Sequence, residues 1–178
     1  MNIEKVKKEH IEFLTPPVDL IGIAKKHDIT IFYGKYSDDF SGAIYVSDKT
    51  PQIIKEENYF KFIILNSNHA VTRQRFTLAH ELGHYFLDYL DESGQYRESI
   101  YEHRDSGNRL DKDEFRINNF AAELIMPSES LFKELNNNFF KVTEIDLELV
   151  RDLAKIYQVS FDAMRNRLRW IRGFYGQF

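Results

Sequence analysis

The chain is constrained most by one helical stretch that carries two histidines four positions apart. Between residues 70 and 90 the apolar residues recur at helical spacing, at Val71, Leu78, Leu82, Phe86 and Leu90. His80 and His84 lie within this stretch. Because residues four apart in an α-helix lie about 40° from one another around the axis, both imidazoles project in one direction. The spacing therefore predicts a helix that could hold a metal ion.

Composition restricts the ligands of such a site. The 178 residues include no cysteine, so a metal site must be built from histidine, aspartate and glutamate. The run His80-Glu81-Leu82-Gly83-His84 is typical of zinc metalloproteases. Glu81 lies about 100° from His80 around the helix, near enough to activate an attacking water but poorly placed as a ligand. We predict zinc ligation by His80 and His84 and general-base catalysis by Glu81; the alternative is that both histidines are ordinary helix residues.

A third ligand is needed, because catalytic zinc sites use three protein ligands and leave one position open. The metzincin pattern is excluded, since it requires glycine and histidine where this chain has Leu87 and Leu90. The acidic candidates in the next predicted helix, residues 111–126, are Asp111, Asp113, Glu114 and Glu123. Glu114 is the predicted ligand because it shares one helical face with Ile117 and Ile125, and an inward carboxylate needs a partner. The alternative is a first-turn glutamate that the helix dipole favours.

Two residues near these ligands are each open to two interpretations. Gly83 costs about 1 kcal/mol in a helix interior relative to alanine, which indicates either a close approach by some group or plain packing against a neighbouring helix. Asn118 could orient Glu114 or a histidine, or it could simply be exposed. The candidates for stabilising a developing oxyanion are Tyr96, Tyr101 and His103, although such residues are more often surface groups.

The remaining chain predicts an α+β fold with a small antiparallel sheet. β-Branched and aromatic residues favour strands at residues 29–33, 42–46 and 60–65, with the strand near Gly42 as a candidate edge strand. Helices are expected at residues 18–27, 70–90, 111–126 and 130–135, with Ser128 as a cap, and as a pair within residues 144–171 that is broken near residue 159. The polar sequence of residues 91–112, which has no clear period, predicts a long loop or lid.

Two domain-level assignments follow from these elements. Residues 1–140 form the predicted zinc metallopeptidase domain, with a zincin-like active-site helix pair. Residues 141–178 form a C-terminal helical extension that we expect to pack on the same domain.

Residues 73–84 read RQRFTLAHELGH, and Glu114 is followed at residues 118–127 by NNFAAELIMP. With this spacing, the two blocks resemble the ImmA/IrrE family of bacterial and phage metallopeptidases, and the likeness extends more loosely over residues 18–168. The resemblance implies His80, His84 and Glu114 as zinc ligands and Glu81 as catalytic base, in agreement with the helical geometry. Ile117 stands where the family usually has alanine, which we expect to alter only packing.

Members of that family are typically encoded near helix-turn-helix repressors, and several relieve repression by cleaving or otherwise inactivating them. The resemblance therefore implies an intracellular zinc endopeptidase whose protein substrate is a DNA-binding repressor or a similar regulatory protein. Two alternatives remain open. One is a non-proteolytic regulator whose metal site is structural or sensory, and the other is a toxin-type protein held by a partner.

Charge and hydropathy set the expectations for partners and location. The net charge of −4 gives no global basic excess that would favour a polyanionic partner. The first ten residues are largely charged and lack the apolar stretch of a secretory signal. No apolar run approaches the length of a membrane span, so we expect a cytoplasmic protein without a membrane partner.

The C-terminal segment has the helix, turn, helix rhythm of DNA-reading modules. It carries four arginines, Arg165, Arg167, Arg169 and Arg172. The same segment has an apolar face formed by Met164, Leu168 and Ile171, which fits a helical pair packed on the catalytic core. Direct nucleic-acid binding is therefore not favoured, and we expect the arginines to form a solvated face or a partner-binding patch.

Overall fold

The computed structural model describes residues 2–46, 61–90, 110–135 and 145–175. Within these ranges the chain has an α+β fold with seven α-helices and one three-stranded sheet. The elements follow in the order α1 (Ile3–Glu9), η1 (Ile11–Phe13), α2 (Leu20–Lys26), β1 (Thr30–Gly34), β2 (Gly42–Val46), β3 (Lys61–Asn66), α3 (Val71–His84), η2 (Tyr85–Tyr89), α4 (Leu110–Ile125), α5 (Ser128–Glu134), α6 (Leu147–Tyr157) and α7 (Phe161–Tyr175). None of the helices in these ranges has the length and hydropathy to cross a membrane.

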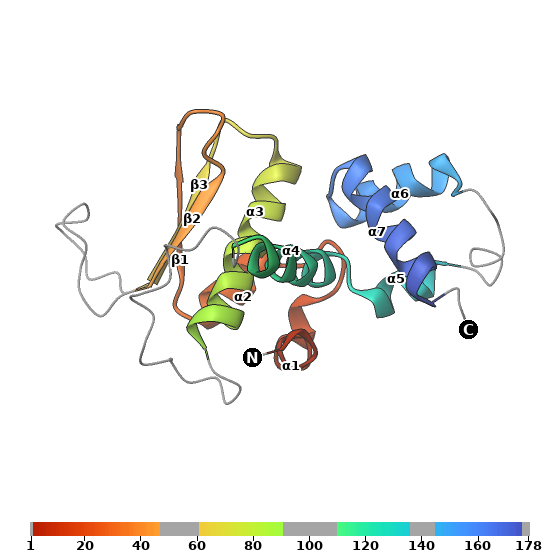
Figure 1. Cartoon of the computed structure of the whole chain (residues 1–178), viewed down its shortest axis with the longest axis horizontal. Coiled ribbons are helices and arrows are strands. Elements are labelled where there is room, and N and C mark those ends of the chain that lie inside the picture. Colours follow the sequence, from red (N-terminus) through yellow and green to blue (C-terminus); the bar gives the residue numbers. More distant parts are fainter. Residues whose placement is uncertain (1, 47–60, 91–109, 136–144, 176–178) are drawn as a thin grey trace.

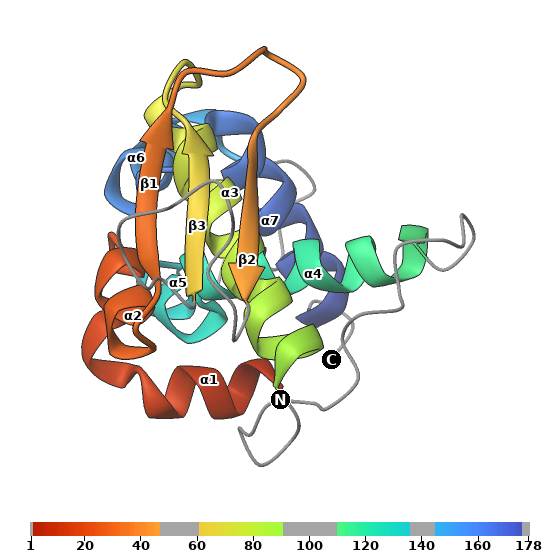
Figure 2. The ribbon, with the colours of Figure 1, turned by 90° about the vertical axis from the view of Figure 1, so that its left-hand side faces the viewer.

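Helix α3 is the central element of the molecule. β2 and β3 pack against it, and so does α4. Figure 1 shows the sheet on one side of α3 and the helices α5, α6 and α7 on the opposite side of the molecule, beyond α4. Figure 2 shows the three strands in front of α3, with α4 extending to the right from beside the lower part of β2. The predicted metal-binding helix is therefore packed against both the sheet and α4.

The sheet is mixed, so the predicted antiparallel sheet is wrong in part. Its strand order is β1-β3-β2, in which β3 pairs parallel with β1 and antiparallel with β2. The last strand inserts between two strands that run in opposite directions, so it must be parallel to one of them. β3 takes the centre because it has the most continuous apolar run, in which Phe62 and Ile63 are buried. β2 lies at an edge, as predicted.

The helices that the sequence predicts are present, with differences near the second histidine and near Pro127. α3 ends at His84, and Tyr85–Tyr89 form one π-helical turn where an α-helix was expected to continue. α4 begins and ends within one residue of the predicted bounds. The predicted cap by Ser128 is wrong, because Pro127 is the N-cap of α5 and the hydroxyl of Ser128 donates a hydrogen bond to Glu123.

The N-terminal helix α1 lies outside the elements that the sequence predicts. Its first turn is capped by Asn2, whose side chain accepts a hydrogen bond from the backbone N–H of Lys5 at 2.9 Å. Only Val6 and Lys7 are buried, so the segment lacks the repeated apolar spacing that would mark it as a helix. The helix nevertheless packs against α4.

Candidate metal centre

The close approach of α3 and α4 depends on Gly83. A Cβ atom built at Gly83 would lie 3.1 Å from Cγ2 of Ile117 and 3.2 Å from Cδ1 of Phe120. Both neighbours are buried, so they have little room to move. Of the two interpretations of Gly83, the structure supports packing against a neighbouring helix. The contact brings the first half of α4 opposite the histidines of α3.

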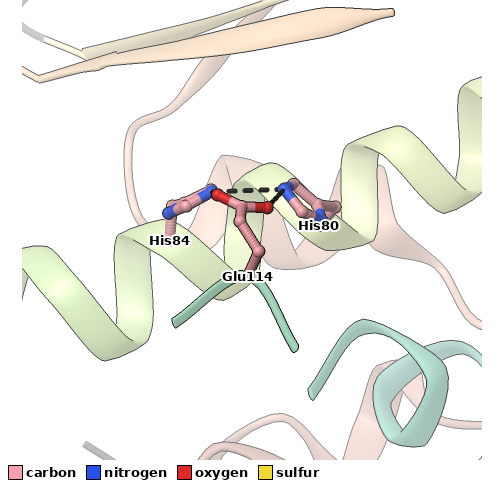
Figure 3. Close-up of side chains that lie close together, drawn as sticks. All are labelled: His80, His84 and Glu114. Atoms are coloured by element: carbon pink, nitrogen blue, oxygen red, sulfur yellow. Dashed lines mark hydrogen bonds and ion pairs between the residues drawn. The ribbon is translucent and has the colours of Figure 1, made fainter. Parts of the chain in front are cut away.

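Three side chains converge between these helices, and they are the three predicted ligands (Figure 3). The Nε2 atoms of His80 and His84 lie 3.2 Å apart. Oε2 of Glu114 lies 3.3 Å from Nε2 of His80, and its Oε1 lies 3.5 Å from Nε2 of His84. Ligands arranged tetrahedrally at about 2.0–2.1 Å from zinc are about 3.3 Å from one another. The two imidazole nitrogens and the carboxylate oxygens nearest to them therefore have about the spacing that one zinc ion requires.

Each imidazole is oriented by a side-chain acceptor at its other nitrogen. Nδ1 of His80 lies 3.0 Å from Oδ1 of Asn118, and Nδ1 of His84 lies 2.7 Å from Oδ2 of Asp88. A proton on each Nδ1 makes these contacts hydrogen bonds and leaves the Nε2 lone pairs facing Glu114. Asn118 thus contacts a histidine, although the residue as a whole is exposed.

The electrostatics of His84 reflect its contact with Asp88. Burial lowers the pKa of His84, but the hydrogen bond to Asp88 and the charges of Glu81, Asp88 and Glu114 outweigh it and raise that pKa above its ordinary value. The negative charges around His84 favour a cation at this position.

Glu81 lies beside the three converging side chains but takes no part in their contacts. Its side chain is buried, and Oε2 accepts a hydrogen bond from the backbone N–H of Ile44 on the edge strand β2 at 3.0 Å. Burial raises the pKa of Glu81 above its ordinary value, although His84, His80 and the Ile44 N–H act in the opposite direction. A carboxylate with a raised pKa is suited to accept and return a proton near neutral pH.

The edge strand can approach Glu81 because Gly42 has no side chain. A Cβ atom at Gly42 would lie 2.6 Å from Cγ2 of Thr77 on α3 and 2.7 Å from the backbone oxygen of Ile64 on β3. No side chain fits between these atoms without a shift of backbone. Gly42 therefore lets β2 lie directly on α3.

The other acidic candidates lie elsewhere. Glu123 contacts Lys7, Ser128 and Arg167 near the far end of α4. Asp113 is exposed and lies 4.0 Å from Arg116. The side chain of Asp111 lies outside the described part of the structure. The proposed oxyanion residues and residues 91–109 of the predicted loop or lid lie outside the described residues, and residues 110–112, which the prediction also assigns to that loop, belong to α4.

A second set of carboxylates has the spacing of a cation site, but a lysine lies among them. Glu4, Glu123 and Glu129 offer oxygens close to one another. Nζ of Lys7 lies 3.0 Å from Glu4 and 2.8 Å from each of Glu123 and Glu129. The ammonium group therefore supplies the positive charge that these carboxylates need.

Two residues of the site were missed by the sequence analysis, Asp88 and Arg116. Asp88 accepts from His84 and also from Nη2 of Arg116 on α4, at 2.7 Å. A signal for Asp88 was present, because it follows His84 by four residues on the same helical stretch. Arg116 has no comparable signal, since its partner lies 28 residues away.

Comparison with known proteins identifies the family of the chain. No curated protein matches the sequence. The model of the IrrE N-terminal-like domain, which defines the family Peptidase_M78, matches residues 24–169, and these residues include α3, η2 and α4. More than half of the chain is matched, so the chain belongs to the Peptidase_M78 family of metallopeptidases.

Proposed function

We propose that this metallopeptidase is a zinc endopeptidase in which His80, His84 and Glu114 bind the ion and Glu81 is the general base. The observation that carries the proposal is the convergence of two imidazole nitrogens and one carboxylate at 3.2–3.5 Å, with a buried glutamate beside them. Three ligands leave one position of a tetrahedral ion open for water or substrate, as a catalytic site requires.

The chemistry is divided between the ion and Glu81. When bound, zinc supplies a Lewis acid that acidifies water and polarises the scissile carbonyl. Glu81 takes the proton from the attacking water and returns it to the leaving amine. Its burial raises its affinity for that proton, and the Ile44 N–H holds the carboxylate in place between turnovers.

The edge strand β2 offers a docking site for an extended peptide. Ser41 accepts a hydrogen bond from the backbone N–H of Asn66, so in the antiparallel register the backbone groups of Gly42, Ile44 and Val46 point away from β3. The Ile44 N–H already donates to Glu81, and among the described strands this edge of β2 is otherwise unpaired. A substrate strand can pair there in the β-augmentation mode of peptide recognition. We propose that the substrate binds there, beside Glu81.

The proposed substrate is a helix-turn-helix repressor or a similar regulatory protein encoded near this chain. The support is the resemblance to the ImmA/IrrE family, several of whose members relieve repression by cleaving or otherwise inactivating such repressors. The free edge of β2 requires only that the substrate present an extended segment, such as a linker between folded domains.

The test combines zinc content with cleavage of the repressor encoded beside this chain. We expect about one zinc per chain in the wild-type protein and loss of the metal in His80→Ala and Glu114→Ala. Glu81→Gln should keep the zinc and abolish cleavage, because the amide preserves the shape of the carboxylate but cannot accept the proton.

Three results would count against the proposal. Full zinc retention in Glu114→Ala would remove Glu114 from the site. Cleavage by Glu81→Gln at the wild-type rate would rule out the assigned base, while a zinc-loaded wild-type protein that leaves the repressor intact would favour the non-proteolytic alternatives.

A further inference from the structure

We propose that Asp88 and Arg116 form a clamp that positions His84 for the metal and couples it to the helix that carries Glu114. The inference deepens the proposed function and rests on its metal site. It assigns positioning roles to two residues, neither of which supplies a ligand atom to the group formed by His80, His84 and Glu114.

The clamp is a continuous chain of contacts across three elements. Nδ1 of His84, the last residue of α3, lies 2.7 Å from Oδ2 of Asp88 in the π-helical turn η2. The other oxygen of Asp88 accepts from Nη2 of Arg116 on α4, also at 2.7 Å. Both oxygens of one carboxylate are thus used, one toward the histidine and one toward α4. π-Helical turns are frequent at functional sites.

The clamp acts on both the orientation and the basicity of His84. A carboxylate at Nδ1 fixes the ring and the tautomer, and it makes the opposite nitrogen a stronger ligand. Arg116 in turn fixes Asp88, because its planar guanidinium holds the carboxylate in one orientation. Since Arg116 follows Glu114 by two residues on α4, the same contact sets the distance between His84 and Glu114.

The exposure of Asp88 and Arg116 indicates that their ion pair contributes little to folding stability. The side chains of Asp88 and Arg116 are 36% and 49% exposed. Ion pairs with this exposure contribute at most about 1 kcal/mol to stability. Removal of the clamp should therefore weaken metal binding much more than it weakens the fold.

The asymmetry between the two histidines supports the same conclusion. Nδ1 of His80 contacts the neutral amide oxygen of Asn118 at 3.0 Å, whereas Nδ1 of His84 contacts the charged carboxylate of Asp88 at 2.7 Å. A hydrogen bond to a charged acceptor is shorter and about twice as strong as a neutral one. His84 is therefore the histidine whose geometry depends most on its supporting partner.

The test measures zinc affinity by competition with a chromophoric chelator. We expect Asp88→Ala to weaken zinc binding about 10–100-fold, and Asp88→Asn to weaken it less, because an amide oxygen can still accept from His84. Arg116→Met should weaken binding by a smaller factor, and Arg116→Lys should retain more affinity than Arg116→Met. The double variant Asp88→Ala/Arg116→Met should bind zinc as Asp88→Ala does, because Arg116 acts through Asp88.

Two further readouts distinguish positioning from structural damage. The melting temperature of each variant in excess chelator should stay close to that of the wild-type protein. The visible spectrum of the Co²⁺-substituted protein should change in Asp88→Ala, since that spectrum reports ligand geometry. The matched control is Asp113→Asn, which removes an exposed negative charge from α4 next to Glu114 and should leave zinc affinity within about 2-fold.

The outcomes separate this inference from the proposed function. A wild-type protein that fails to bind zinc contradicts the proposed metal site itself. A wild-type protein that binds zinc, together with Asp88→Ala at wild-type affinity and with an unchanged Co²⁺ spectrum, overturns the clamp alone. Equal weakening by Asp113→Asn and Asp88→Asn, or additive losses in the double variant, would also overturn it, because the effect would then be general charge or two independent sites.

Discussion

His27 shows how burial tunes a single residue away from the metal site. Its Nε2 lies 2.8 Å from Nε2 of His10, and its ring packs on the edges of Tyr85 and Phe86. Nδ1 of His10 is 2.7 Å from the backbone oxygen of Val6, so His10 donates there and accepts from His27. Burial, followed by the charge of His10, lowers the pKa of His27 to about 4.

This shift predicts a loss of stability on mild acidification. The folded pKa of His27 lies below the ordinary value of about 6.5, so between these pH values the unfolded chain binds more protons than the folded chain. Stability should therefore fall as the pH is lowered from 7 to 5, and His27 should account for about 1 kcal/mol of the loss after screening by solvent. Urea unfolding in excess chelator at several pH values measures this loss of stability.

The matched variant is His27→Gln, whose amide can still donate to His10 but does not titrate. The other histidines are common to both proteins, so the difference in slope belongs to His27. Parallel curves for the wild-type protein and His27→Gln would show that His27 does not carry the effect.

Two helical glycines differ in their surroundings, and only Gly83 lies where α3 packs on α4. Gly83 faces buried side chains of α4, whereas a Cβ atom at Gly173 on α7 would meet nothing within 4 Å. Alanine is favoured over glycine in a helix interior by about 1 kcal/mol. We predict that Gly173→Ala raises the melting temperature and that Gly83→Ala lowers it, because Ile117 and Phe120 must move.

Gly83→Val sharpens this prediction, since two more methyl groups cannot fit against α4. Overpacking of this kind costs about 1–3 kcal/mol. It should also weaken zinc binding, because α4 carries Glu114. If Gly83→Ala and Gly173→Ala stabilise the protein equally, the close approach at Gly83 is not a constraint.

The sequence predicts some features of the fold and not others, because only features that follow from a periodic residue pattern can be predicted. His80, His84 and Glu114 lie on faces that the period within each helix defines, so their convergence could be predicted, while their role as zinc ligands stays a prediction. The strand order could not be predicted, because β3 inserts between β1 and β2 through contacts that leave no periodic signal. The π-helical turn after His84 likewise has no local signature.

At the scale of the whole molecule, one buried ionic network joins the two ends of the chain to α4. Arg167 on α7 contacts Glu123 on α4, donates to the backbone oxygen of Met126 at 3.1 Å and donates to Ser128 at 2.8 Å. Lys7 on α1 contacts the same glutamate. The expectation that all four C-terminal arginines are solvated is therefore wrong for Arg167, whose partner lies 44 residues away in the sequence.

The charges of this network support one another. Burial raises the pKa of Glu123, but Arg167, Lys7 and Ser128 outweigh it and hold that pKa below its ordinary value. Burial lowers the pKa of Lys7, and the hydrogen bonds to Glu123, Glu129 and Glu4 raise it above its ordinary value. Both shifts favour the charged forms of Glu123 and Lys7, and removal of one member of the network leaves a buried charge short of a partner.

Trp170 can report the unfolding of α7, because it is the single tryptophan of the chain and lies on that helix. If α7 is held by Arg167 and packs as part of the same unit as α4, fluorescence of Trp170 and far-ultraviolet circular dichroism should follow one unfolding transition in the wild-type protein.

Arg167→Met should lower the unfolding free energy by about 3 kcal/mol. Arg165→Met, which removes a partly exposed pair with Asp162, should cost less than about 1 kcal/mol. Two separate transitions in the wild-type protein, or equal losses in the two variants, would mean that the C-terminal helices fold independently of the catalytic core.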